Sequence, residues 1–387
     1  MSQTSSTIPM RAFRSAITSA LLLTLWAGGC ARAQDGASAL PEAAERRAAG
    51  IAVREVARSR VDTLFQQVTG VDVDSRGRVY VGDWFASRVA VLDSTGALVA
   101  TMGRRGLGPG EFRSIRGVQV LPGDSLLVYD PSAARLSVFA PGAAAPAYVL
   151  NVGAASAPPF LIHRTRANDA FVAMFRPAFR GDDTARATER LRVLGLDGRP
   201  RGEPLRAYPA RGFLRVSGPD GFAVTPDPFG SEGLYAVGAD GRIHYLWSDS
   251  LAVETMDLEG RRTGGFSVRY RPPRVQREDV ASEIAGMPPQ MMEVFRRALE
   301  DSLPERWPAA RALLADPDGR LWIGLHTPAG EPREWAVFTA GGRYLGSVFL
   351  PRESELHAVR GRRLYTVQKD ADDVPHVVVY RMDAQPG

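Results

Sequence analysis

The chain repeats itself between Gly70 and Gly142 in a register of 47 residues without gaps. Positions of the first copy recur in the second as the same residue or as a similar apolar one. They are Gly70, Val71, Val73, Val81, Asp83, Arg88, Val91 and Leu92, matched by Gly117, Val118, Val120, Val128, Asp130, Arg135, Val138 and Phe139. Short apolar runs closed by glycine turns, at a period of about 40 to 50 residues, are typical of the blades of a β-propeller.

The same plan predicts four further blades towards the C-terminus. Residues 316–324 align without gaps on residues 74–82, which marks blade five clearly. Blade six, at residues 356–382, contains only two or three clear strands, so we expect a strand from residues 51–58 to complete it and close the ring. The two weaker blades are placed by strand and turn spacing at residues 160–198 and 234–268.

Blades one, two and five match a common order of motifs well. It runs as an apolar strand, Asp-x-x-Gly, an aromatic strand ending in aspartate, an arginine with a second apolar strand, and a glycine. In this order, and in the linker-like residues 103–112 (GRRGLGPGEF), residues 70–383 resemble the NHL-repeat and related bacterial six-bladed β-propellers of the TolB-like superfamily. The resemblance implies an all-β fold of six four-stranded antiparallel blades. It implies little about activity, because this architecture carries scaffolds, receptors, lactonases and lyases.

One segment, residues 275–301, breaks the strand pattern. It begins with acidic residues and then places apolar residues at helical spacing: Val280, Ile284, Met291, Phe295 and Leu299. We expect a short two-helix insertion between blades four and five. Its apolar stripe either packs on the propeller or belongs to a lid or partner-docking element.

The N-terminus is typical of an export signal. Arg11 and Arg14 precede an apolar run at residues 17–27, which is shorter than the roughly 20 residues of a transmembrane helix. Two cleavage sites compete: residues 27–30 resemble a lipobox that would leave Cys30 lipidated, and Ala-Arg-Ala at residues 31–33 suits ordinary signal peptidase. We therefore expect a signal peptide over residues 1–33, a flexible tether or loose helix over 34–50, and a propeller over 51–387.

This reading places the protein outside the cytoplasm, in the periplasm, on the outer membrane as a lipoprotein, or secreted. Contact with a membrane is expected only through a lipid on Cys30. That cysteine is the only one in the chain, so the exported domain has neither an intramolecular disulfide nor a thiol nucleophile. We also expect a monomer.

The charge of the chain argues against nucleic-acid binding. Removing residues 1–33 takes away three arginines and no acid, which lowers the formal net charge from +5 to +2. Lys369 is the only lysine, and the arginines alternate with acids instead of forming a basic run. A nucleic-acid partner is therefore not expected.

Binding residues are expected on the loops between the second and third strands of the blades, which vary in length and chemistry. Variable loops on a rigid scaffold are where recognition usually occurs. The candidates on this face are Trp84, Phe85, Arg88, Arg135, His326 and Lys369. Two pairs among the loop residues, Asp83 with Arg88 and Asp130 with Arg135, recur at the blade period. We interpret them as structural pairs, because a catalytic pair does not need a duplicate in the next blade.

A metal site in the central channel is the main enzymatic alternative. His163 and His357 fall on expected innermost strands and are weak ligand candidates, although no two histidines stand at a metal-ligand spacing. A calcium site of the lactonase type would draw on oxygen ligands, and asparagine is scarce, with Asn151 and Asn168 alone. No nucleophile elbow or H-E-x-x-H motif is present. No cofactor is predicted, with a divalent calcium or zinc ion as the alternative.

The sequence therefore favours an exported propeller that recognises a protein, peptide or glycan on its variable-loop face, without enzymatic activity. One alternative is a channel-metal hydrolase or lyase, similar to a lactonase or an amidating lyase. The other is an envelope scaffold with no small ligand.

Overall fold

The computed structural model describes residues 38–60, 65–152, 157–165, 169–176, 188–218, 221–285 and 303–384, with residues 292, 295, 296 and 299. The chain divides into Met1–Gly36 and Ala37–Gly387, and all described residues belong to the second unit. The predicted signal peptide, its two cleavage sites and Cys30 lie outside the described residues.

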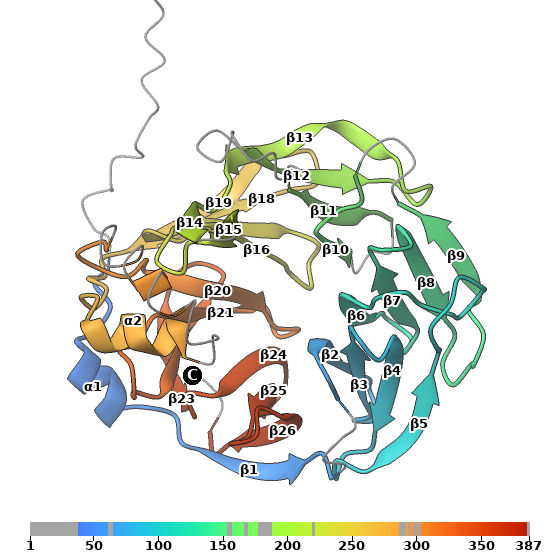
Figure 1. The fold of residues 1–387 in the computed structure, drawn as a ribbon, viewed down its shortest axis with the longest axis horizontal. Coiled ribbons are helices and arrows are strands. Elements are labelled where there is room, and N and C mark those ends of the chain that lie inside the picture. Colours follow the sequence, from blue (N-terminus) through green and yellow to red (C-terminus); the bar gives the residue numbers. More distant parts are fainter. Residues whose placement is uncertain are drawn as a thin grey trace, which may run out of the picture. The chain divides into compact units, whose positions relative to one another are not determined.

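Six four-stranded antiparallel sheets follow one another around a common centre, so the predicted six-bladed propeller is confirmed (Figure 1). Blade one is β2 (Val68–Val73), β3 (Val79–Asp83), β4 (Arg88–Leu92) and β5 (Leu98–Met102), and blade two is β6 (Gly117–Val120), β7 (Leu126–Asp130), β8 (Arg135–Phe139) and β9 (Tyr148–Asn151). Blade three is β10 (Leu161–Arg164), β11 (Phe171–Phe175), β12 (Thr188–Leu194) and β13 (Pro200–Pro209), and blade four is β16 (Gly233–Val237), β17 (Ile243–Trp247), β18 (Leu251–Met256) and β19 (Arg262–Val268). Blade five is β20 (Ala310–Ala315), β21 (Arg320–Leu325), β22 (Arg333–Thr339) and β23 (Tyr344–Leu350).

Blade six closes the ring as expected. It contains β24 (Ser354–Arg360), β25 (Arg363–Lys369) and β26 (Pro375–Met382), and its fourth strand is β1 (Val53–Arg58) from the N-terminal side. Strand β1 pairs antiparallel with β26, from Val53 opposite Met382 to Arg58 opposite Val378. Figure 1 shows the blue β1 beside the red β26. The two ends of the propeller are thus joined by backbone hydrogen bonds.

The first turn of a blade is held by an aspartate, which explains the Asp-x-x-Gly motif. In blade one, Asp74 accepts hydrogen bonds from the backbone N–H groups of Arg76 and Arg78 and from the Arg78 guanidinium, with Nε–Oδ2 at 2.6 Å. In blade five, Asp316 binds Arg320 at the same distance and accepts a 2.8 Å bond from the buried Trp322 indole. The repeated aspartate therefore fixes the turn and satisfies the polar atom of the aromatic strand at once.

Apolar side chains fill the space between adjacent blades. Val81 and Leu92 of blade one share a buried cluster with Val377 and Val379 of blade six, for example. These strands are buried on both faces, so they read as continuous apolar runs rather than as strict alternation. Packing between sheets therefore stabilises the ring all the way round, including across its closure.

Among the elements that the structure describes in full, two helices accompany the blades. Helix α1 (Ala43–Ala48) lies in the segment expected to be a tether, and its flanks bond to the propeller: the Leu40 N–H to the Arg269 carbonyl at 3.0 Å, and the Ile51 N–H to the Ser347 carbonyl at 2.8 Å. Helix α2 (Arg277–Ile284) lies between blades four and five, where the insertion was predicted. None of the helices among the described residues is long and apolar enough to cross a membrane.

The structure adds one element that the sequence did not predict. Strands β14 (Phe213–Gly218) and β15 (Gly221–Pro226) form a hairpin of their own between blades three and four. It lies outside the four-stranded sheets, so it has no counterpart at the blade period. Together with α2 it makes the chain between blades three and five richer in insertions than the rest of the ring.

Candidate functional site

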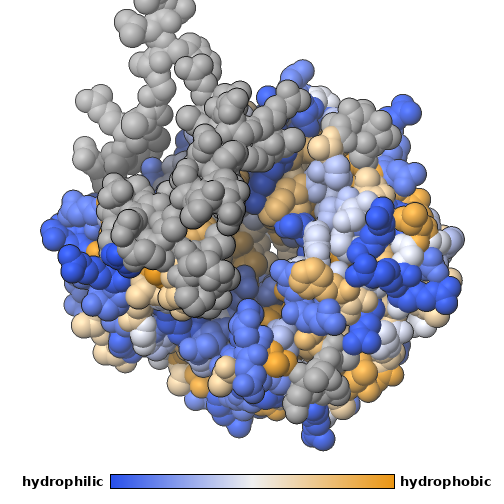
Figure 2. All heavy atoms as spheres, in the orientation of Figure 1, coloured by the Kyte–Doolittle hydropathy of each residue, from blue (hydrophilic) through white to orange (hydrophobic). Residues whose placement is uncertain are grey.

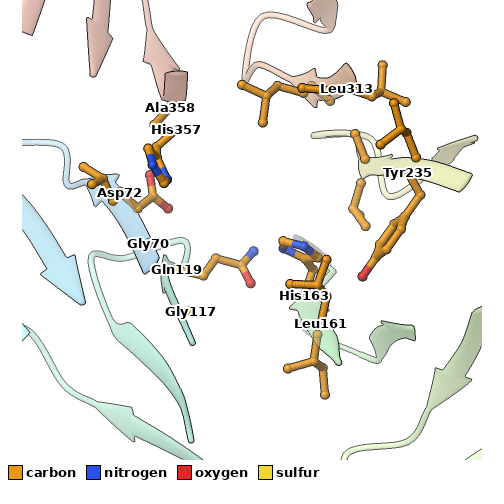
Figure 3. A pocket seen from close by; sticks show the side chains of 18 of the residues that line it. Gly70, Asp72, Gly117, Gln119, Leu161, His163, Tyr235, Leu313, His357 and Ala358 are labelled. Atoms are coloured by element: carbon orange, nitrogen blue, oxygen red, sulfur yellow. The ribbon is translucent and has the colours of Figure 1, made fainter. Parts of the chain in front are cut away.

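The innermost strands of all six blades line a central channel with a cavity of about 610 Å³. The strands are β2, β6, β10, β16, β20 and β24. Figure 2 shows the side of the ring seen in Figure 1, which is hollowed at its centre. In Figure 3, side chains of Asp72, Gln119, His163, Tyr235 and His357 surround this space.

The polar groups in the channel are partly tied to one another. The Asp72 carboxylate accepts a 2.8 Å bond from the Arg360 guanidinium and another from the Val120 N–H. Gln119 exchanges hydrogen bonds with the backbone of Arg164, at 2.8 and 2.9 Å. These bonds cross between blades one, two, three and six, so they brace the ring as well as lining the channel.

His163 and His357 lie on β10 and β24, on the innermost strands where the sequence placed them, and both line the channel. Burial lowers the pKa of His163 to about 4 and also lowers the pKa of His357, so both are neutral at pH 7. Neutral imidazole is the metal-binding form. Among the described residues, however, no three histidine, cysteine, aspartate or glutamate side chains stand close enough to hold a metal ion.

The loop residues Asp83 and Asp130 are buried and act alike. Asp83 accepts backbone N–H bonds from Gln66 at 2.7 Å and from residues 85 and 86, and Asp130 accepts them from Arg113 at 2.7 Å and from residues 114 and 133. Each carboxylate therefore ties its own loop to the linker that precedes its blade.

Arg135 does not form the ion pair with Asp130 that the sequence suggested. Arg135 lies opposite Asp130 in the strand register, but no ion pair joins these two described side chains. The Arg135 guanidinium instead donates to the carbonyl oxygens of Leu107, at 2.8 Å, and of Glu111. Arg88 lies opposite Asp83 in the register in the same way. Arg135 thus holds the inter-blade linker rather than the aspartate.

Two further candidates are already engaged within the protein. Lys369 forms an exposed ion pair with Asp373 at 2.8 Å, across the tight turn between β25 and β26. His326 stacks on Trp307, with ring centroids 4.5 Å apart. Burial and the neighbouring Arg311 lower the pKa of His326 to about 3, so this imidazole is neutral.

The aromatic candidates Trp84 and Phe85 lie on the loop face in different surroundings. Phe85 is 55% exposed. Trp84 instead packs under Arg116, whose guanidinium carbon lies 5.2 Å from the Trp84 ring and 4.1 Å from the Phe160 ring. Arg176 covers Phe160 at 3.6 Å. Two arginines and two aromatic rings thus alternate beside a cavity of about 280 Å³ at the channel mouth.

A second cavity, of about 220 Å³, opens on the same side between blades four and five. Among the described residues, the two cavities are lined by six arginines and two glutamates. The arginines are Arg116, Arg176, Arg211, Arg311, Arg333 and Arg352, and the glutamates are Glu232 and Glu283. The face on which the sequence placed recognition is therefore strongly cationic around the channel mouth.

The sequence analysis missed these arginines, although the repeat held a signal for two of them. Arg116 stands 47 residues after Thr69, and the alignment of residues 316–324 on 74–82 places Arg311 at the same blade position. In blade one the Thr69 hydroxyl donates to the Ile115 carbonyl at 2.5 Å. One repeated position is thus a threonine in blade one and an arginine in blades two and five. This difference between the blades is the signal that the sequence analysis could have used.

The comparisons with known proteins report on the fold only. No family model matches the sequence, and no curated protein matches it. Similar solved structures include a member of the DUF4221 family from Bacteroides vulgatus, at 11% identity and a TM-score of 0.49, over 88% of this chain and 99% of that chain. A catalytically inactive virginiamycin B lyase from Staphylococcus aureus matches at 10% identity and a TM-score of 0.41, over 87% of this chain and 90% of that chain. A luciferin-regenerating enzyme matches at 13% identity and a TM-score of 0.46, over 87% and 96%. These likenesses are too distant to bear on the ligand, and membership of the NHL-repeat family stays a prediction.

Proposed function

We propose that this protein is an exported binding module that recognises an acidic peptide or protein segment across the mouth of its channel. The observation that carries the proposal is the set of six arginines against two glutamates in the described lining of the two mouth cavities. Such a concentration of one charge in a cleft attracts a ligand of the opposite charge and orients its approach.

Arg116 is the clearest contact residue of this surface. Among the described residues, no hydrogen bond or ion pair links its guanidinium to a carboxylate, and its guanidinium carbon lies over the rings of both Trp84 and Phe160. Burial and the nearby Arg176 lower the pKa of Arg116, so a ligand carboxylate at this position would be favourable for the charged guanidinium. A guanidinium fixed by stacking keeps its N–H groups ready for a carboxylate, at little cost in side-chain entropy.

Exposed apolar residues on the same face favour a peptide or protein over a purely polar glycan. Phe85 is 55% exposed and Leu107 is 64% exposed. Their backbones are fixed: Arg105 donates to the Phe85 carbonyl at 3.1 Å, and Arg135 donates to the Leu107 carbonyl at 2.8 Å. Aromatic side chains and arginine are both enriched in protein interfaces relative to the rest of the surface.

The alternative of a channel-metal hydrolase or lyase has less support. The described residues offer His163 and His357 as single ligands, with no third ligand grouped beside them. Export and a possible lipid on Cys30 remain part of the proposal, since they rest on the sequence of residues 1–33 alone.

Binding of labelled peptides to the full chain tests the proposal. Acidic, neutral and basic peptides of equal length, each with one aromatic residue, are titrated while anisotropy and tryptophan fluorescence are followed. We expect the acidic peptides to bind most tightly, to weaken with added salt, and to change the emission of Trp84. The Arg116→Gln variant should weaken acidic-peptide binding about tenfold or more.

The control is Arg242→Gln, which removes an arginine from an exposed turn between β16 and β17. This variant should bind like the parent. Equal binding of acidic and basic peptides, or equal loss in both variants, contradicts the proposal. Binding of a sulfated oligosaccharide in preference to every peptide would replace the peptide with an anionic glycan.

A further inference from the structure

Arg311 occupies an irregular position on the innermost strand of blade five. Ala310 pairs with Leu325 and Ala312 pairs with Gly324, so Arg311 is the extra residue of a β-bulge. Its guanidinium carbon lies 4.9 Å from the Trp335 ring centroid, and a Cβ added at Gly324 would lie 3.4 Å from it. A bulge re-aims a side chain out of the regular pattern, and a glycine opposite it leaves room for the guanidinium.

The Arg311 guanidinium has no ion-pair partner among the described residues, and Glu355 is the one carboxylate there that acts on its charge from nearby. Its Nε and Nη2 atoms are buried and have no hydrogen-bond partner among the described residues. Burial and then Arg333 lower the pKa of Arg311 to about 9, which leaves it protonated at pH 7. Burying a charge without a partner costs free energy, because the guanidinium loses water that no protein group replaces.

The other cations around the 220 Å³ cavity are also held by neutral groups. The Arg333 Nε donates to the Arg352 carbonyl at 2.5 Å, and the Arg352 Nη1 donates to the carbonyls of Thr327, at 3.1 Å, and Pro328, at 2.9 Å. Carbonyl oxygens orient a guanidinium without cancelling its charge. Arg211 is the exception, because its Nη1 lies 3.3 Å from Glu232.

The carboxylates that line this cavity do little to offset the arginines. Glu232 is shared between Arg211 and Arg176, the latter at 3.7 Å. Glu283 comes from α2 and is exposed to solvent, which weakens its interaction with the arginines of the cavity. The cavity therefore has an excess of fixed positive charge.

Helix α2 is built into the wall of the same cavity. Asp279 accepts a 2.7 Å bond from the Ala329 N–H, in the loop between β21 and β22, and a 3.2 Å bond from the Trp307 indole. Trp307 in turn stacks on His326, and both rings line the cavity. The predicted insertion thus holds one side of the cavity rigid rather than standing apart from the ring.

We infer that this cavity is an oxyanion site, in which Arg311, Arg333 and Arg352 together hold a carboxylate, sulfate or phosphate group. Three guanidinium groups around one small cavity match the several acceptor oxygens of such a group. The group is either a free inorganic oxyanion or an acidic group of a larger ligand. In the second case the inference rests on the proposed function and names the acidic side chain or terminal carboxylate of the bound peptide as its occupant.

The site is tested with inorganic sulfate and phosphate alone, at low millimolar concentration and constant ionic strength set with chloride. Melting temperature and isothermal titration are measured on the full chain, on Arg311→Met and on Arg242→Gln. We expect sulfate or phosphate to raise the melting temperature of the parent and of Arg242→Gln. In Arg311→Met the anion affinity should fall about tenfold or more, while the melting temperature in chloride stays equal or rises, because an unpaired buried charge is gone.

An equal anion effect in the parent and in Arg311→Met is a general salt effect and overturns the inference, as does the absence of any effect in the parent. If Arg311→Met does not fold, Arg333→Gln takes its place with the same expected loss of anion affinity. Competition between sulfate and the acidic peptide assigns the site to a group on the peptide. If the anion binds without competing with the peptide, the site binds a free oxyanion and is separate from the peptide-binding surface. If Arg116→Gln weakens peptide binding while sulfate and phosphate have no effect on the parent, the proposed function stands and this site is rejected.

Discussion

Arg46 and Glu334 form a buried ion pair with two hydrogen bonds, which fixes helix α1 to blade five. The Arg46 Nε lies 2.5 Å from Glu334 Oε1 and its Nη2 lies 2.9 Å from Oε2, and each side chain is 5% exposed. The Ser347 hydroxyl donates a further 2.7 Å bond to Glu334. Residues 38–50 are therefore anchored to the propeller at a specific point.

Replacing Arg46 with alanine should destabilise the protein strongly. The substitution leaves the Glu334 carboxylate buried without its partner, which typically costs about 3–5 kcal/mol. Urea unfolding measures the loss. Arg47→Ala is the control, since Arg47 forms an exposed pair with Glu331 and its removal should cost less than about 1 kcal/mol. Similar losses in the two variants would contradict the anchoring role.

Two glycines with the same backbone conformation should differ sharply when changed to alanine. Gly103 and Gly123 both have φ +79°, but a Cβ at Gly103 would lie 2.4 Å from the Phe112 ring, whereas nothing lies within 4 Å of one at Gly123. Gly123→Ala should cost about 1 kcal/mol from backbone strain alone. Gly103→Ala adds a clash with a fully buried ring and should cost about 2–4 kcal/mol. Thermal unfolding of both variants checks the difference, and equal costs would mean that the linker can move away from Phe112.

The free energy of unfolding should fall as the pH drops from about 6.5 towards 4. Burial lowers the pKa of His163 from an ordinary value of 6.5 to about 4. Between these values the unfolded chain binds a proton that the folded protein does not. The contribution of His163 to the free energy of unfolding is therefore fully present above pH 6.5 and is lost as the pH falls below it. One such histidine contributes roughly 3 kcal/mol at most.

The variant His163→Phe tests this assignment, because it keeps a ring against Tyr235, whose centroid lies 5.6 Å away. Urea unfolding at several pH values should show a smaller slope in the variant. Part of the slope should remain, since burial also lowers the pKa of His326 and His357. An unchanged slope would show that His163 does not titrate in this range.

A chelator should leave the melting temperature unchanged, because the described residues group no three metal-ligating side chains. The measurement compares the purified full chain with and without chelator, and with added calcium or zinc, alongside its metal content. A stoichiometric metal whose removal lowers the melting temperature would revive the hydrolase or lyase alternative. In that case His163→Ala combined with His357→Ala should lose the metal while the fold survives.

The ring could be predicted from the sequence because its signals are local and repeated. Gly70 and Gly117 begin equivalent strands, and the turns at Asp74 and Asp316 are built by residues within four positions of each other. The missing strand of blade six was predictable for a different reason, since a blade of three strands leaves an unpaired edge.

The mouth of the channel could be predicted only in part. Its face followed from the order of strands, and Trp84 and Phe85 lie in the loop between β3 and β4 on that face. The grouping of Arg211, Arg311 and Arg352 depends on how the chain between blades three and six folds back, and no spacing in the sequence encodes it. The burial of Arg46 was hidden in the same way, because its partner is 288 residues distant.

The pairing of β1 with β26 also sets an order of events in time. The backbone of Ser59 meets that of Val377 across 318 residues, and such a contact gains nothing until the chain between them is already compact. Blades one to five can each form from neighbouring residues, whereas blade six needs both ends of the ring. We therefore expect the β1–β26 pairing to form last during folding and to open first under mechanical or thermal load. A chain arrested before residue 382 should stay an open ring in which β1 is not paired with a complete β26.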